Sequence, residues 1–145
     1  MEENKPINKL NGWLSNKFNI AFLLVLLGSI IIRVYYFIIT RAQPLWYDEA
    51  DYGSVGIHWA TNLPYDINSQ RPPLLPFLEF LILKIGGGEV LMRFLLLVLP
   101  SIAIVVLAYL IGKEMYNKKV GLIASITTAV FWEILFNTTR FHVEV

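Results

Sequence analysis

Three carboxylates lie within four positions of the segment Trp46–Tyr52, which reads Trp-Tyr-Asp-Glu-Ala-Asp-Tyr. They belong to Asp48, Glu49 and Asp51, and they follow a long apolar segment. Ionised carboxylates are costly inside a bilayer, so this run is expected at the membrane surface. There a carboxylate can take a proton from an acceptor group or bind a cation, and a lipid-borne substrate can reach it. The segment is therefore the first place to look for chemistry.

Asp48 also has a structural interpretation. It precedes an expected short helix over Glu49–Thr61, and Asp51 follows three positions later, which resembles a capping box with Asp in place of Glu. An N-cap contributes about 1 kcal/mol to helix stability. Capping and catalysis are compatible, because a cap holds a carboxylate at a fixed position.

Two arginines, Arg71 and Arg93, flank a short apolar stretch that follows this segment. Guanidinium groups suit phosphate because they present paired donors in a fixed geometry. The phosphate can be that of a substrate or of ordinary lipid headgroups, and the pattern leaves both open. The aromatic residues of the same outer segment are typical of the belt at a membrane interface; they are Trp46, Tyr47, Trp59 and Tyr65.

Arg33 and Glu133 are charges inside otherwise apolar segments. Such charges tend to pair or to line a cavity, and both residues are expected at similar depths below the outer surface. We therefore predict that they pair, with snorkelling of Arg33 to the outer interface as the alternative. His142 and Glu144 share a face of an extended segment and can form half of a metal site, although no other ligands accompany them.

The composition indicates a membrane protein. Of 145 residues, 56% are hydrophobic and 16% are charged, and the mean hydropathy is +0.56. A soluble domain typically has 45–50% apolar residues and about a quarter charged ones. The net charge of +1 argues against a nucleic-acid partner. The absence of cysteine excludes disulfides and thiolate metal sites.

The apolar runs predict an all-α integral membrane fold with about three transmembrane helices, over 20–40, 89–111 and 120–138. The run from Ile20 is longer than a signal-peptide core, so it is expected to be an uncleaved anchor. The stretch Pro73–Ile85 has 13 residues and reaches only about 20 Å, so it is expected to lie flat in the interface. Glu49–Thr61 and Pro73–Ile85 are therefore expected to form two short juxtamembrane helices.

The lysines predict the orientation. Three lie in the tail 1–19 and three in the link Gly112–Lys119, so both should be cytoplasmic. If Pro73–Ile85 spanned the membrane, three crossings would separate the tail from the link and place them on opposite sides. If it lies flat, two crossings separate them and both are cytoplasmic, so the lysines support the flat helix. The loop 41–88 and the end of the chain are then on the outer face of the plasma membrane.

Taken in order, these features resemble the N-terminal part of the GT-C glycosyltransferase superfamily, especially the group of protein O-mannosyltransferases and aminoarabinose lipid A transferases. The match covers 20–145, which would form the N-terminal part of such a transmembrane domain. The residues that carry it are Asp48-Glu49 with Tyr52, Arg71-Pro72-Pro73-Leu74, Arg93-Phe94, the basic turn Tyr109–Lys119, and Thr139-Arg140 with Glu144. The group usually has Asp where this chain has Glu144.

The resemblance implies inverting transfer of a sugar from a polyprenyl-phosphate donor to a protein, lipid or glycan acceptor at the outer face. It implies Asp48 as general base, with Glu49 orienting it or meeting the acceptor. It gives Arg71, Arg93, Arg140 and Tyr52 as substrate-binding residues. No cofactor is certain, and a divalent metal held in part by Glu144 is an option.

Members of the superfamily are several times longer, so the chain is expected to be a fragment that is inactive alone. The alternative is a small non-enzymatic membrane protein that binds a lipid-linked sugar or a partner subunit. In either case membrane lipids are its surroundings.

Overall fold

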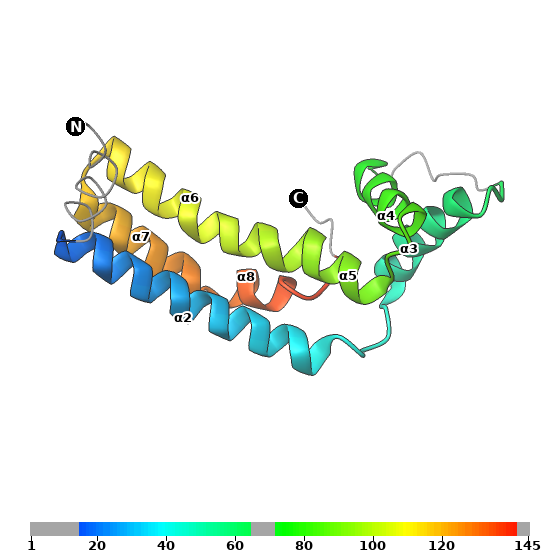
Figure 1. Ribbon diagram of the computed structural model, residues 1–145, viewed down its shortest axis with the longest axis horizontal. Coiled ribbons are helices and arrows are strands. Elements are labelled where there is room, and N and C mark those ends of the chain that lie inside the picture. Colours follow the sequence, from blue (N-terminus) through cyan, green and yellow to red (C-terminus); the bar gives the residue numbers. More distant parts are fainter. Residues whose placement is uncertain (1–14, 65–71, 142–145) are drawn as a thin grey trace, which may run out of the picture.

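The computed structural model describes residues 15–64 and 72–141, and every regular element within them is a helix (Figure 1). The all-helical prediction is therefore confirmed for this part of the chain. In order, the elements are α2 (Lys17–Thr40), α3 (Tyr47–Ala60), α4 (Leu74–Lys84), α5 (Glu89–Arg93), the π-helical turn η1 (Phe94–Val98), α6 (Leu99–Met115), α7 (Lys118–Val130) and α8 (Trp132–Asn137).

Two helices in the described residues are long and apolar enough to cross a membrane. They are α2, with 24 residues, and the continuous helix Glu89–Met115 formed by α5, η1 and α6, with 27 residues. At 1.5 Å per residue they extend about 36 and 40 Å, more than the hydrocarbon thickness of about 30 Å. Most of their residues are not buried in the protein, which is unlike the core helix of a soluble domain.

The third expected span is not one helix. The structure breaks 120–138 at Phe131, whose φ of −63° and ψ of 118° are extended rather than helical. The break leaves α7 with 13 residues and α8 with 6, or about 20 and 9 Å. The prediction of a continuous third helix was wrong for this reason, and the count of three spans is not confirmed.

Arg33 lies at this break and is completely buried. Its Nη1 and Nη2 donate to the carbonyl oxygens of Ala129 (3.2 Å) and Thr128 (3.5 Å), and its Nε donates to Ser101 Oγ (3.1 Å). The last carbonyls of a helix lack intrahelical partners, and their partial negative charge favours a cation. Arg33 therefore caps the C-terminal end of α7.

This geometry corrects both interpretations of Arg33. Glu133 is not among its hydrogen-bond partners, which also include the hydroxyl and carbonyl oxygens of Ser29. Snorkelling is excluded as well, because the guanidinium faces the interior of the helix bundle. The carbonyls of a broken helix compensate the buried charge instead of a carboxylate.

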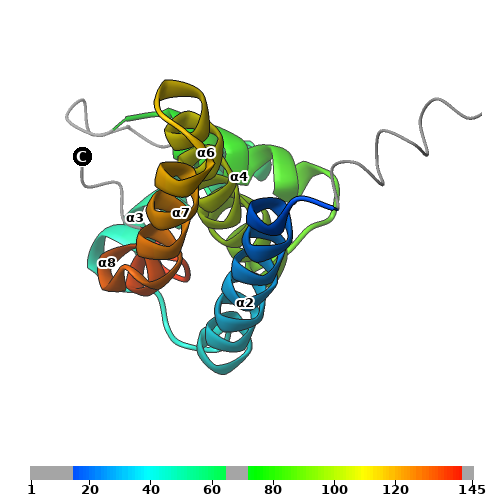
Figure 2. The same cartoon turned by 90° about the vertical axis from the view of Figure 1, so that its left-hand side faces the viewer.

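Helices α2, α6 and α7 lie side by side, as Figure 2 shows from the end where α2 begins. The turn between α6 and α7 is tight: a Cβ on Gly121 would lie 2.5 Å from the carbonyl oxygen of Tyr109. Asn117 caps α7 by accepting from the backbone N–H of Lys119 and Val120. The basic link and the start of α2 therefore share one end of the bundle.

The two predicted short helices are present as α3 and α4, which pack on each other near the other end of the bundle (Figure 1). The two helices are close together at Gly56, where an added Cβ would lie 2.9 Å from the Cβ of Glu79. After α3 the chain turns at Asn62, with a φ of 58°, and after α4 at Gly86, with a φ of 84°. Both values lie in the left-handed region that glycine and asparagine tolerate best.

Candidate functional site

Glu49 is the centre of the candidate site, and its side chain is fully buried. Its Oε2 accepts a hydrogen bond from the backbone N–H of Trp46 (2.7 Å). Its Oε1 accepts one from the backbone N–H of Phe141 (2.8 Å), which is 92 positions away in sequence. One carboxylate therefore joins the start of α3 to the far end of the described chain.

Glu49 also takes the capping role that the sequence suggested for other residues. The N-cap of α3 is Trp46, and the bond from its N–H to Glu49, three positions on, is the reach-back half of a capping box. The assignment of Asp48 as N-cap with Asp51 as its partner was therefore wrong. The helix begins two residues earlier than expected.

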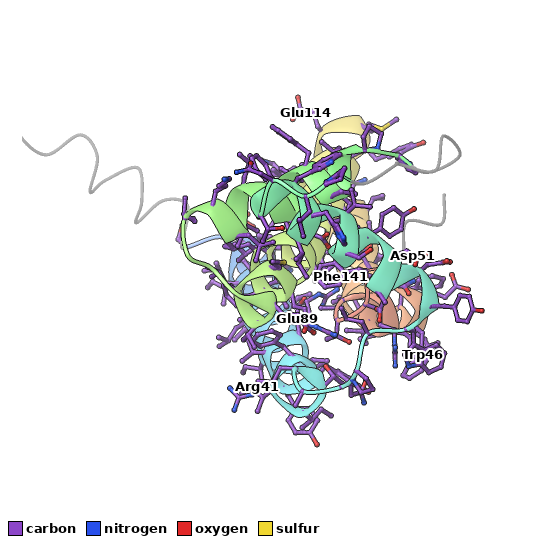
Figure 3. The ribbon with its side chains drawn as sticks, turned by 90° about the vertical axis from the view of Figure 1, so that its right-hand side faces the viewer. Arg41, Trp46, Asp51, Glu89, Glu114 and Phe141 are labelled. Atoms are coloured by element: carbon purple, nitrogen blue, oxygen red, sulfur yellow. The ribbon has the colours of Figure 1, made fainter. Side chains whose placement is uncertain are left out.

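Asp48 lies in the first turn of α3 and is half-buried. A carboxylate there is stabilised by the positive end of the helix dipole. Its neighbour Glu49 points inward, whereas Asp51 is exposed at the edge of the molecule (Figure 3). Of the acidic pair Asp48-Glu49, only Asp48 is thus accessible to a molecule outside the fold.

Arg140 lies beside the same turn. Its Nη1 is 3.8 Å from Glu49 Oε2, and its guanidinium carbon is 4.3 Å from the centre of the Trp46 ring. Its Nη2 donates to Gln43 Oε1 at 3.3 Å. The side chain is 12% exposed, so a small part of it is accessible to solvent next to the start of α3.

Arg93 differs from Arg140 in that its side chain is almost completely buried, with only 2% exposed. Its Nη1 donates to the carbonyl of Thr139 (2.9 Å), and its Nη2 donates to the carbonyl of Gln43 (3.1 Å). Its Nε donates to Glu89 Oε1 at 2.9 Å. In this arrangement Arg93 positions two chain segments, and its role as a phosphate ligand stays a prediction without structural support.

The segment Thr138–Phe141, which we call the junction segment, is held from both sides. Glu49 binds its last backbone N–H and Arg93 binds one of its carbonyls. The Phe141 side chain is 2% exposed and packs with Ile82 and Met92 in a small core. Figure 3 shows Phe141 well inside the outline of the molecule. The junction segment therefore connects α3, α4 and α5.

The other residues that the sequence suggested for binding are either buried or outside the described part of the chain. Tyr52 is buried, so its side chain belongs to the packed interior rather than to the surface. Arg71 and Glu144 lie outside the described residues, as does His142. Within 15–64 and 72–141, no three His, Cys, Asp or Glu side chains lie close enough together to hold a metal ion. The metal proposal for Glu144 stays a prediction.

Glu79 is a buried acid that we did not predict as functional. It is 1% exposed, faces Gly56 between α3 and α4, and its Oε2 has no hydrogen-bond partner among the described residues. Burial raises the pKa of Glu79 from 4.5 to about 7, because the apolar surroundings penalise the charged form. A glutamate within the apolar stretch Pro73–Ile85 was the sequence signal for this position.

The raised pKa makes a prediction for pH. Since the folded-state pKa exceeds the unfolded value, Glu79 contributes stability that is complete below about pH 4.5 and is lost as pH rises to about 7. We expect the free energy of unfolding in micelles to fall over this range relative to that of Glu79→Gln. A constant difference between the two proteins from pH 4.5 to 7.5 would contradict the prediction.

In comparisons with protein-family models, curated proteins and solved structures, the chain matches none of them.

Proposed function

We propose that the chain forms part of a membrane glycosyltransferase. It would transfer a sugar from a polyprenyl-phosphate donor to a protein, lipid or glycan acceptor at the outer face. The observation that carries the proposal is that the start of one helix presents the half-buried carboxylate of Asp48 and has the partly exposed side chain of Arg140 beside it. An acid that can accept a proton and a cation that can bind phosphate are the two groups that this chemistry needs.

The reaction is a displacement at the anomeric carbon of the donor sugar. The acceptor hydroxyl attacks this carbon, its proton passes to Asp48, and the bond to the phosphate oxygen breaks. The leaving polyprenyl phosphate keeps the bonding electrons, and Arg140, with Arg71 as a further candidate, stabilises its charge. Glu49 is already used by two backbone N–H groups, so its part is to fix the turn that carries Asp48.

The proposed topology has the N-terminus in the cytoplasm, with α2 crossing outward and Glu89–Met115 crossing inward. Lys17, at the start of α2, and the lysines of the link lie at the same end of the bundle, which supports this orientation. The broken pair α7 and α8 would form the third crossing. Irregular backbone is tolerated at membrane depth where protein groups satisfy it, as Arg33 does at Ala129. The candidate site is then on the outer face.

Asp48→Asn tests the proposal. The change keeps the size of the side chain and removes the base. Asp48 is not the helix cap, so the loss of its interaction with the helix dipole, about 0.3–1 kcal/mol, should leave the protein folded. In native membranes that contain the whole transferase of which the chain is proposed to be a part, we expect transfer of radiolabelled sugar from polyprenyl-phosphate donors to fall at least about 100-fold. Insertion and helix content of the variant should equal those of the wild type. Retained transfer would refute the assignment of Asp48.

The non-enzymatic alternative is favoured by one observation. Glu49 and Arg93, two of the charged residues expected at the site, are used for internal contacts. The groups left at the surface can bind a lipid-linked sugar without reacting with it. In that case Arg140→Gln would weaken binding of a polyprenyl phosphate in nanodiscs, because the phosphate loses its cation, whereas Asp48→Asn would not weaken it. No transfer would be detected with the wild type in native membranes.

A further inference from the structure

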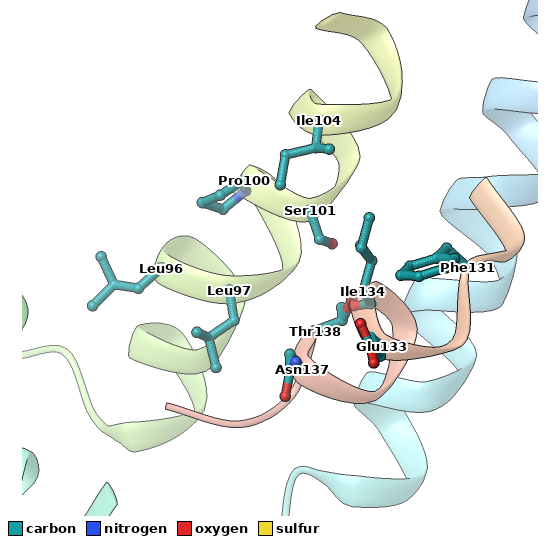
Figure 4. A pocket seen from close by; sticks show the side chains of 10 residues that line it. All are labelled: Leu96, Leu97, Pro100, Ser101, Ile104, Phe131, Glu133, Ile134, Asn137 and Thr138. Atoms are coloured by element: carbon teal, nitrogen blue, oxygen red, sulfur yellow. The ribbon is translucent and has the colours of Figure 1, made fainter. Parts of the chain in front are cut away.

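An open groove lies between the helix Glu89–Met115 and α8, and its volume is about 330 Å³ (Figure 4). It is formed where the break at Phe131 displaces α8 from the line of α7. The lining is largely apolar, with one charged residue, Glu133, in the first turn of α8. The other lining residues are Leu96, Leu97, Pro100, Ser101, Ile104, Phe131, Ile134, Asn137 and Thr138.

The groove lies at membrane depth. Leu97 and Ser101 are 8 and 12 residues from Glu89, the first residue of the long helix. They therefore lie about 12 and 18 Å along its axis. Arg33, which lies within α2, bonds to the same Ser101 and confirms the level. Lipid headgroups lie at the surface of the bilayer, so a headgroup does not reach this level.

Glu133 is exposed, and its carboxylate has no hydrogen-bond or ion-pair partner among the residues that the structure describes. A lone charge costs on the order of 3 kcal/mol at the centre of a membrane, and such residues normally pair. Arg33, the nearest candidate by depth, is already fully used by α7, Ser29 and Ser101. Among the residues described by the structure, the groove therefore has no cation to pair with Glu133.

A second copy of the chain does not supply this cation from the long helices. Within the described part of these helices the basic residues are Lys17, Arg33, Arg93 and Lys113. Arg33 and Arg93 are buried, and Lys17 and Lys113 lie at the opposite end of the bundle. The charge must come from another molecule or from a chain segment outside these helices.

We propose that the groove is a docking site for a transmembrane helix that carries one Lys or Arg at membrane depth, and that this cation pairs with Glu133. Apolar side chains of the incoming helix would fill the groove against Leu97, Ile104 and Ile134. The basic side chain would extend to the carboxylate. The ion pair would fix the depth and rotation of the partner helix, because only one register brings the two charges together.

The test uses synthetic partners in lipid vesicles. A leucine-rich transmembrane peptide of about 20 residues carries a single Lys at the matching depth, and a matched peptide carries Leu there. Association with the dye-labelled chain is measured by energy transfer. We expect the Lys peptide to bind about tenfold more tightly than the Leu peptide, and we expect Glu133→Gln to remove this preference.

Two controls make the result specific. Glu114→Gln removes an exposed glutamate near the opposite end of α6 and should leave the preference unchanged. The Glu133→Lys variant should no longer bind the Lys peptide, because the two positive charges repel each other. It should instead bind a peptide that carries Glu at the same depth. Equal binding of the Lys and Leu peptides by the wild type would overturn the proposal. A preference that survives Glu133→Gln would overturn it as well.

Discussion

Replacing Glu49 by Ala is expected to detach the junction segment from the start of α3. The change removes the acceptors of two backbone N–H groups, those of Trp46 and Phe141, and Phe141 is buried. The buried N–H of Phe141 left without a partner costs about 1–3 kcal/mol. The N–H of Trp46 is only partly buried, and loss of its capping bond adds about 1 kcal/mol, so the free energy of unfolding should fall by about 2–4 kcal/mol. Because both broken contacts lie at the start of α3, the loss should be concentrated at the α3 end of the molecule.

Hydrogen exchange in micelles measures this effect residue by residue. The amide of Phe141 and the first amides of α3 should exchange faster in Glu49→Ala, whereas the amides at the α6–α7 turn should not change. Glu49→Gln should give an intermediate result, because an amide side chain has one oxygen to accept a hydrogen bond where the carboxylate has two. Glu114→Gln serves as the matched surface control. Unchanged exchange at Phe141 in Glu49→Ala would show that the carboxylate does not hold the segment.

Replacing Arg33 by Met is expected to destabilise the helix bundle strongly. Methionine has similar length but no donors, so Ser101 Oγ loses a buried partner and the carbonyls of Thr128 and Ala129 lose their cap. With about 1–3 kcal/mol for each unsatisfied buried group, a total loss of about 3 kcal/mol or more is expected. The buried charge itself carries a desolvation cost, which its removal recovers and which reduces the loss.

The free energy of unfolding by sodium dodecyl sulfate gives the measurement. Arg33→Lys should be intermediate, because an ammonium keeps the charge but has three donors, fewer than the five of guanidinium. Arg41→Met, at the exposed end of α2, is the control and should change stability by no more than about 0.5 kcal/mol. If Arg33→Met and Arg41→Met were equally stable, the cap would contribute nothing measurable.

The sequence predicted well the features that depend on neighbouring residues. The lengths of the apolar runs beginning at Ile20 and Glu89 predicted the two long helices, since a helix of that composition needs no distant contact to form in a bilayer. The short helices α3 and α4 followed from breaks at Asn62 and at the glycines after Ile85. Most of the chain is helical for these local reasons.

The break at Phe131 could not be predicted in this way. No proline or glycine occurs at 129–133, so the local sequence continues a helical pattern. What stabilises the break is Arg33, which lies 96 positions before Ala129 and binds the carbonyls that the break leaves free. The groove lies beside the same break, and so does Glu133, which has no partner within 15–64 and 72–141.

For the candidate site, the sequence by itself determined which residue types are present. It also determined that Asp48 and Glu49 lie at the start of a helix that follows one long and apolar enough to cross a membrane. It did not determine the division of roles between them. Only the tertiary structure turns Glu49 inward to the N–H of Phe141 and uses Arg93 at Thr139, leaving Asp48 and Arg140 accessible. The physical reason is that buried backbone groups must find hydrogen-bond partners, and which side chains supply them depends on segments that meet only in the folded chain.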